Sequence, residues 1–120
     1  AVVEAMAYQT RDVIDAMTAA SHHPVSSLRV DGGASAMHLL LGLQADQLGV
    51  PVRRPTITET TALGAAFLAG LAEGVWPTCD DITARWTLDH EAHPSADRSV
   101  ADAAYGQWRR AVERARDWAR

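Results

Sequence analysis

The sequence predicts an α/β fold that is rich in helix, with two short parallel strands and a helix at the carboxyl end. Two observations carry this prediction. Apolar residues recurring every three or four positions indicate helices, and these alternate with short runs typical of strands. Such an alternation is typical of parallel strands joined by right-handed crossovers. Two strands are too few for a stable sheet, so we expect further strands to belong to the same domain.

A first helix is predicted over residues 1–20, where apolar side chains recur at the steps that one buried helix face requires. Pro24 ends it, because the residue before a proline is pushed away from helical backbone angles. The helical pattern is already under way at Ala1, which is not a methionine and has no capping residue before it. We therefore expect the chain to be part of a longer protein.

A strand, a glycine turn and a second helix follow. Residues 27–31 are predicted to form a short strand, and Gly32 and Gly33 directly after it predict a sharp turn. We expect the second helix to begin near residue 34 or 35 and to reach about Leu48, with its leucines buried and a glycine as its C-cap. This turn is the part of the chain where we expect a ligand to bind.

The second strand and the third helix come next. Residues 50–53 are predicted to form a strand parallel to the first. A helix capped by Thr58 or Thr60 is then predicted to run to about Ala72. Its interior is rich in alanine and glycine, which predicts close packing against another backbone, since a glycine inside an exposed helix costs about 1 kcal/mol.

The remainder is predicted to be helical and loop. The aspartates at 80–81 are expected to cap a short helix that ends near Trp86, and residues 87–97 are expected to form a polar loop. Ser99 is expected to cap the last helix, with Asp102 as its capping-box partner. One stripe of this helix is expected to pack on the domain: Ala104, Trp108, Ala111, Ala115 and Trp118.

Composition and charge exclude several classes of function. The chain has 120 residues, 48% of them hydrophobic, which fits one globular domain or part of one. Its 11 basic residues are all arginine and are outnumbered by 15 acidic residues, so neither nucleic acid nor an anionic membrane is an expected partner. No apolar run reaches the ~20 residues of a transmembrane helix. The single cysteine, Cys79, excludes an internal disulfide, and the expected location is cytoplasmic.

The segment that carries chemistry is the strand–glycine–glycine–helix junction. Gly32 and Gly33 have no Cβ, so a ligand can approach their backbone closely. The amides of the following helix favour a polar or anionic ligand, and open α/β sheets bind ligands at the carboxyl ends of their strands. By spacing alone, the favoured interpretation is a glycine pair that only makes a tight turn.

Five segments, in order, resemble the carboxyl-terminal part of glycerol kinases, which are members of the FGGY carbohydrate kinases. They are residues 4–13, which include the Tyr-Gln-Thr-Arg-Asp run, 29–34 with Asp-Gly-Gly-Ala, 44–55, 58–72 and 105–115. The resemblance covers nearly the whole chain. It implies a partial ribonuclease-H-like (actin-like ATPase) domain, with residues 1–120 as the C-terminal part of the second, nucleotide-binding kinase domain. The upstream strands and the first domain would then lie outside the chain.

The resemblance also implies an activity. Glycerol kinases transfer the γ-phosphoryl group of ATP to glycerol with Mg²⁺. The family's catalytic base, glycerol ligands and ion ligands lie upstream, so no catalytic residue and no metal ligand is assigned in this chain, and the fragment alone is expected to be inactive. ATP and glycerol are the expected partners of the intact enzyme, and a homo-oligomer is expected. In the isolated chain the strand at residues 27–31 leaves one edge unpaired, so the isolated chain is expected to self-associate.

Three residues are assigned to nucleotide binding by this resemblance. Gly32 and Gly33 match glycines whose backbone lies along the nucleotide, and Met37 matches a position where the family often has an adenine-binding asparagine. A methionine forms no strong hydrogen bond, so weaker or less base-selective binding is predicted. His38 is a candidate substitute contact, and Asp31 is expected to accept hydrogen bonds from the turn amides.

Two alternative functions stay open at this point. One is a non-catalytic nucleotide-sensing or interaction module of the same fold, and the other is a kinase for another polyol or sugar. Metal binding by the paired histidines, nucleophilic chemistry at Cys79 and an acid role for Glu59 are set aside in favour of solvated loops, a free thiol and a helix-dipole position.

Overall fold

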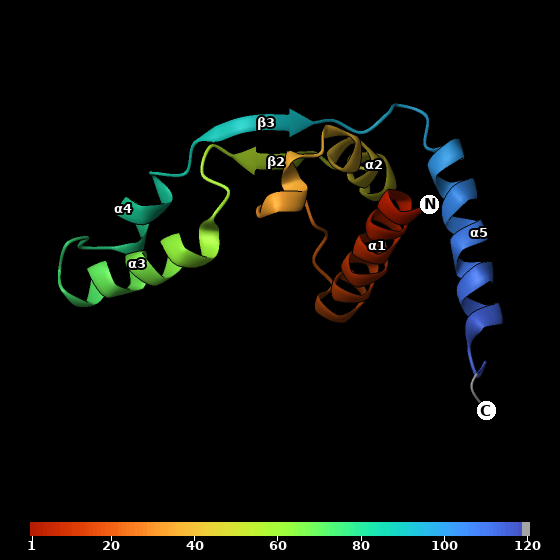
Figure 1. Cartoon of the computed structure of the whole chain (residues 1–120), viewed down its shortest axis with the longest axis horizontal. Coiled ribbons are helices and arrows are strands. Elements are labelled where there is room, and N and C mark those ends of the chain that lie inside the picture. Colours follow the sequence, from red (N-terminus) through yellow and green to blue (C-terminus); the bar gives the residue numbers. More distant parts are fainter. Residues whose placement is uncertain (119–120) are drawn as a thin grey trace.

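A computed structural model describes residues 1–118. The chain is elongated, with extents of 53 × 39 × 30 Å, and a small sheet lies between two helical ends (Figure 1). In chain order the elements are α1 (Val2–Ser21), β1 (Leu28–Arg29), the 3₁₀ helix η1 (Gly33–Ala36), α2 (His38–Leu48), β2 (Val52–Pro55), α3 (Thr60–Ala72), α4 (Cys79–Thr83), β3 (Leu88–Ala92) and α5 (Ser99–Ala115). The predicted α/β class is confirmed.

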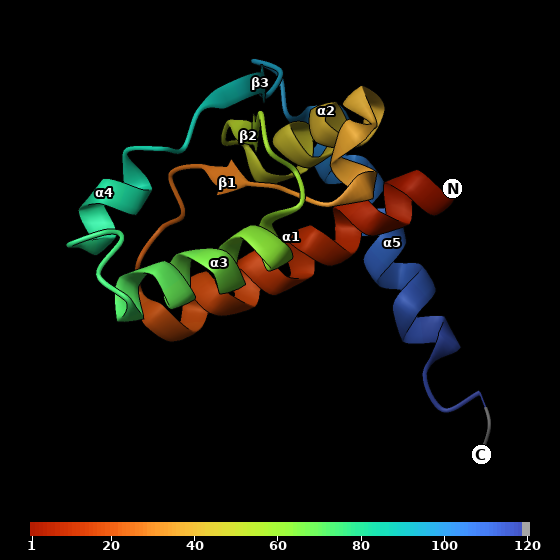
Figure 2. The ribbon, with the colours of Figure 1, turned by 60° about the vertical axis from the view of Figure 1, so that its left-hand side comes forward.

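The sheet has three strands in the order β1-β2-β3 (Figure 2). β1 and β2 are parallel, with Leu28 opposite Val52, as the sequence predicted. β3 pairs antiparallel with β2, so the predicted polar loop over residues 87–97 is wrong where β3 lies. The sequence could not reveal β3, because its polar side chains lack the apolar alternation of a half-buried strand. Among the described strands β1 is an edge, and self-association through it stays a prediction.

The core lies between α2 and the sheet. Leu41, Ala45 and Val52 are fully buried, and Leu28, Val30 and Ala92 are packed around them. α1 covers the other side of α2, where Ala7 is buried. This small core holds the first two strands and therefore the turn that follows β1.

The second helix begins later than predicted. The expected start at Ala34 or Ser35 is wrong, because residues Gly33–Ala36 form a 3₁₀ turn and Met37 is extended before α2 begins. The Ser35 hydroxyl donates to the Gly32 carbonyl at 2.7 Å, and such local side-chain bonds compete with an α-helix. The glycine junction therefore ends in a separate turn.

α3 does not pack as its small residues predict. Leu68 is 70% exposed, and a Cβ at Gly64 would meet nothing within 4 Å. Gly70 is the exception, because a Cβ there would lie 2.0 Å from the Trp76 ring, which is arranged T-shaped with the Phe67 ring. α3 and α4 form the end of the molecule opposite α5 (Figure 1).

The last two helices are capped differently from the prediction. α4 ends at Thr83, before the predicted limit, and its cap is Thr78, whose hydroxyl forms a capping box with Asp81. α5 has no side-chain cap, so the predicted Ser99–Asp102 capping box is wrong. The Asp102 carboxylate instead accepts a hydrogen bond from Arg11 of α1, which lowers the pKa of that carboxyl.

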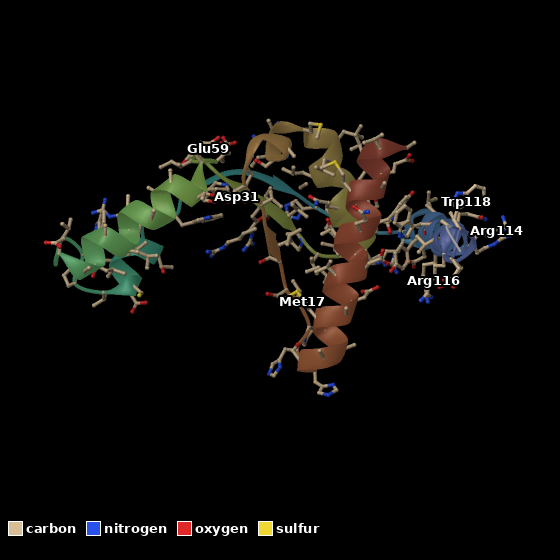
Figure 3. All side chains as sticks on the ribbon, turned by 60° about the horizontal axis from the view of Figure 1, so that its bottom comes forward. Met17, Asp31, Glu59, Arg114, Arg116 and Trp118 are labelled. Carbon is tan, nitrogen blue, oxygen red and sulfur yellow. The ribbon has the colours of Figure 1, made fainter. Side chains whose placement is uncertain are left out.

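The predicted stripe of α5 is only partly in contact with the domain. The Trp108 ring lies 5.6 Å from that of Tyr8, and its indole N–H donates to Asp12 at 2.9 Å. Trp118, the last residue of the stripe, is 89% exposed beside Arg114 and Arg116 (Figure 3). Polar contacts, rather than a continuous apolar seam, therefore hold α5 to α1.

The raised pKa of the Tyr105 phenol leads us to expect that the stability of the fold depends on pH. Burial, together with its hydrogen bond to the Asp12 carboxylate, raises the pKa of the phenol from 10.0 to about 12. The folded state thus keeps a proton that the unfolded chain releases near pH 10, so the free energy of unfolding falls as pH rises from about 10 to about 12. We expect Tyr105→Phe to flatten this fall in urea unfolding curves, whereas Tyr8→Phe should leave it. An unchanged fall in Tyr105→Phe would contradict the assignment.

Candidate functional site

The backbone of the Gly32–Gly33 turn faces open space. Gly32 has φ 75° and ψ 176°, a conformation essentially reserved for glycine. A Cβ built on Gly32 or on Gly33 would meet nothing within 4 Å, so no part of the described chain fills the space beside them. A ligand can therefore lie directly on this backbone.

Three hydrogen bonds from different elements hold the turn. The Gly32 N–H donates to the Thr58 carbonyl at 2.8 Å, which ties the turn to the loop before α3. The buried Ser35 donates its hydroxyl back to Gly32, and the Arg54 guanidinium donates to the Ser35 carbonyl at 2.9 Å. The sequence interpretation missed Thr58, Ser35 and Arg54, because each acts through contacts between elements that spacing does not reveal.

Two exposed carboxylates flank the turn. Asp31 precedes Gly32, and Glu59 follows Thr58 on the loop that is bonded to it (Figure 3). The expected role of Asp31 is wrong in the described structure, because Ser35 rather than Asp31 supplies the side-chain bond to the turn. Glu59 is the N-cap of α3 but makes no side-chain capping bond.

Met37 and His38 end the turn and begin α2. Met37 is 39% exposed, with extended backbone, so its thioether is available to a ligand on the surface. The His38 ring is stacked on that of His90, with ring centroids 4.3 Å apart, which directs it to β3. No side chain caps the N-terminus of α2, so its first amides are also open to a polar ligand.

A hollow of about 630 Å³ lies elsewhere in the chain, between the sheet, α3 and α4. Its lining includes Phe67, Trp76 and Trp86, and the Arg29 guanidinium lies 4.5 Å from the Trp86 ring centroid. None of residues 31–37 lines it, so it is separate from the glycine turn. Its wall is mostly apolar, although Arg29 and Arg85 and four threonines also line it.

Residues 1–118 contain neither a clustered metal-ligand set nor a membrane span. Within that range no three His, Cys, Asp or Glu side chains gather closely enough to hold a metal ion. No helix there has the length and apolar character needed to cross a bilayer.

Comparison with known protein families defines the class of protein. Residues 1–73 match the C-terminal domain of the FGGY family of carbohydrate kinases, and the chain belongs to that family. The chain is 50% identical over 119 residues to a protein named glycerol kinase from Oleidesulfovibrio alaskensis. It is 53% identical over 119 residues to one of the same name from Brachyspira hyodysenteriae. Each match covers 99% of this chain but 24% of the relative, so the chain spans about a quarter of their length.

Solved structures agree with this assignment. A Plasmodium falciparum glycerol kinase crystallised with ADP superposes with a TM-score of 0.79 and 28% identity, covering 95% of this chain and 23% of the other. A xylulose kinase from Rhodospirillum rubrum superposes with a TM-score of 0.76 at 24% identity, over 96% of this chain and 24% of the other. The latter likeness supports the actin-like ATPase fold alone.

Proposed function

We propose that this chain is the C-terminal part of an ATP-dependent glycerol kinase, to which it contributes part of the adenosine pocket. The observation that carries the proposal is 50–53% identity, over 99% of this chain, to proteins named glycerol kinase. The Plasmodium falciparum relative was crystallised with ADP, which supports nucleotide binding in this fold. The intact enzyme would convert glycerol and ATP to glycerol 3-phosphate and ADP.

Within this function the chain's part is to bind and orient the nucleoside. The backbone of Gly32 and Gly33 would lie along it, and Met37 would pack on the purine. Phosphoryl transfer depends on positioning and on electrostatic stabilisation of the transferred group, and Mg²⁺ supplies part of that stabilisation. We place the ion ligands, the catalytic base and the glycerol-binding groups upstream, so the chain alone is expected to be inactive.

The cellular setting is part of the proposal. A cytoplasmic location fits a single exposed Cys79 and an ATP-consuming reaction. A homo-oligomer is also proposed, and the isolated chain is expected to self-associate through β1, which is an edge among the described strands. Light scattering tests the second point, and a strictly monomeric protein at ~100 μM, well above micromolar affinities, would contradict it.

Two other functions have less support. A kinase for another polyol or for a sugar is supported only by the fold of relatives such as the xylulose kinase, whereas the relatives with about 50% identity are named for glycerol. A non-catalytic nucleotide-sensing module is not favoured either, because those relatives are all kinases by name.

Substrate profiling tests the proposed function. The protein encoded by the complete reading frame around this chain should phosphorylate glycerol with ATP, and xylulose and gluconate should be poor substrates. Strong preference for either sugar, or ATP binding without transfer to any polyol, would replace the proposal with the corresponding alternative.

Met37 gives a prediction about affinity. In the same full-length protein, Met37→Asn should tighten ATP binding about 2- to 10-fold, because an amide adds one hydrogen bond worth roughly 0.5–1.5 kcal/mol. Leu39→Asn, the same replacement at an exposed position two residues on, should leave affinity unchanged. Calorimetric titration measures both, and no gain in Met37→Asn would remove Met37 from the pocket.

A further inference from the structure

The Arg54 guanidinium joins the glycine turn to the far strand of the sheet. Its side chain is 13% exposed, and Nη1 donates to the Ser35 carbonyl at 2.9 Å. Nε and Nη2 both donate to one carboxylate oxygen of Asp89 in β3, at 2.9 and 2.6 Å. A planar guanidinium can make all three bonds at once, and no other side chain offers this geometry.

A β-bulge brings Asp89 to this position. Arg54 stands opposite His90 and Pro55 opposite Leu88, so Asp89 is the additional residue between two strand pairs. In a regular strand Asp89 and His90 would point to opposite faces. The bulge interrupts that alternation and re-aims the Asp89 side chain towards the guanidinium, as bulges commonly do beside functional sites.

Ser35, at the other end of this contact, is the residue on which the turn closes. It is buried, and both its hydroxyl and its N–H donate to the Gly32 carbonyl, at 2.7 and 3.1 Å. A bond to the Ser35 carbonyl therefore acts directly on the conformation that exposes the Gly32 and Gly33 backbone. The donor to this carbonyl is Arg54, whose guanidinium is fixed by the Asp89 carboxylate. The Ser35 carbonyl is therefore held in one position.

We propose that Arg54 and Asp89 are positioning residues, which hold the Gly32–Gly33 turn in the shape that the nucleotide requires. This inference rests on the proposed function. The pair does not touch the reacting groups; it acts through Ser35. Because the planar guanidinium donates to Ser35 and to Asp89 at once, a lysine at position 54 can restore only some of these hydrogen bonds.

The neighbouring arginine provides a matched control. Arg53 also pairs with a β3 carboxylate, that of Glu91, but it occupies the adjacent position of β2 and so the opposite face of the sheet. It makes no bond to the turn in the described structure. Arg53→Gln thus removes the same charge and the same kind of cross-strand pair as Arg54→Gln.

Amide hydrogen exchange in the full-length protein tests the first half of the inference. Arg54→Gln should accelerate exchange at the Ser35 and Met37 amides about 10-fold, on the order expected for losing a bond from a charged donor. Asp89→Asn should give a smaller acceleration, and Arg54→Lys should lie between wild type and Arg54→Gln. Equal effects of Arg53→Gln and Arg54→Gln at these amides would overturn a specific role.

Kinetics of the full-length protein test the second half. Arg54→Gln should raise the KM for ATP several-fold with kcat and the KM for glycerol little changed, and Arg53→Gln should alter neither. A KM for ATP that stays at the wild-type value would overturn the inference. If wild type binds no nucleotide, the proposed function itself fails, whereas exchange still reports whether Arg54 holds the turn. Should Arg54→Gln not fold, Asp89→Asn carries both measurements.

Discussion

Leu41→Ala is expected to lower the free energy of unfolding by about 2–5 kcal/mol, the range found when a buried leucine is truncated and its cavity does not collapse. Leu41 is fully buried between α2 and the sheet, and only Ala45 and Val52 share that degree of burial in the central cluster. A domain is typically stable by roughly 5–15 kcal/mol, so this one change would remove much of the stability of the domain to which the chain belongs. Urea unfolding followed by circular dichroism measures the loss.

Two further variants isolate the cause. Leu39 lies on the same helix but is 67% exposed, so Leu39→Ala should change stability by less than about 0.5 kcal/mol. Leu41→Met keeps the volume and should cost less than about 1.5 kcal/mol. If Leu39→Ala destabilised the chain as much as Leu41→Ala, helix propensity or the unfolded state, rather than the core, would explain the effect.

The sequence was sufficient where local chemistry decides the structure. Periodic apolar residues predicted α1, α2 and α5, and β-branched runs beside glycine and proline predicted β1 and β2. The same logic placed a sharp turn at Gly32, whose positive φ only glycine adopts readily. In each case a few neighbouring residues contain the whole signal.

The sequence was insufficient where contacts between distant segments determine the structure. β3 is a strand because β2 offers it backbone partners and two arginines offer its carboxylates ion pairs, none of which its own residues reveal. Small residues in α3 predicted a close neighbour, yet apart from Gly70 the described chain supplies none. The chain spans about a quarter of its relatives' length, so packing patterns in α3 need not be satisfied within it.

The candidate site divides in the same way. Its ligand-facing backbone, Gly32 and Gly33, was predicted from the strand–turn–helix pattern and the family resemblance, and that assignment stays a prediction. Its supporting contacts were not predicted. Asp31 was expected to accept hydrogen bonds from the turn amides, whereas the side-chain bond within the turn is donated by the Ser35 hydroxyl to the Gly32 carbonyl. Arg54 reaches the turn across the sheet and depends on a bulge in another strand, for which no sequence pattern exists.

The two glycines are expected to respond differently to the same substitution. Gly32→Ala places a Cβ on a backbone with φ 75° and ψ 176°, which costs on the order of 1–3 kcal/mol, so both stability and nucleotide affinity should fall. Gly33 begins a 3₁₀ helix without positive φ, and its Cβ would enter open space. Gly33→Ala should therefore keep wild-type stability while a methyl group obstructs the ligand, lowering affinity about 10-fold or more.

Measuring unfolding by urea and ATP affinity by titration in the full-length protein separates these effects. A loss of affinity in Gly33→Ala at unchanged stability would indicate that the ligand occupies the space beside that backbone, which the described chain leaves open. Full affinity in Gly33→Ala would mean that the glycine pair merely makes a turn. The nucleoside would then have to bind elsewhere, and the roles of Met37 and Arg54 would fall with it.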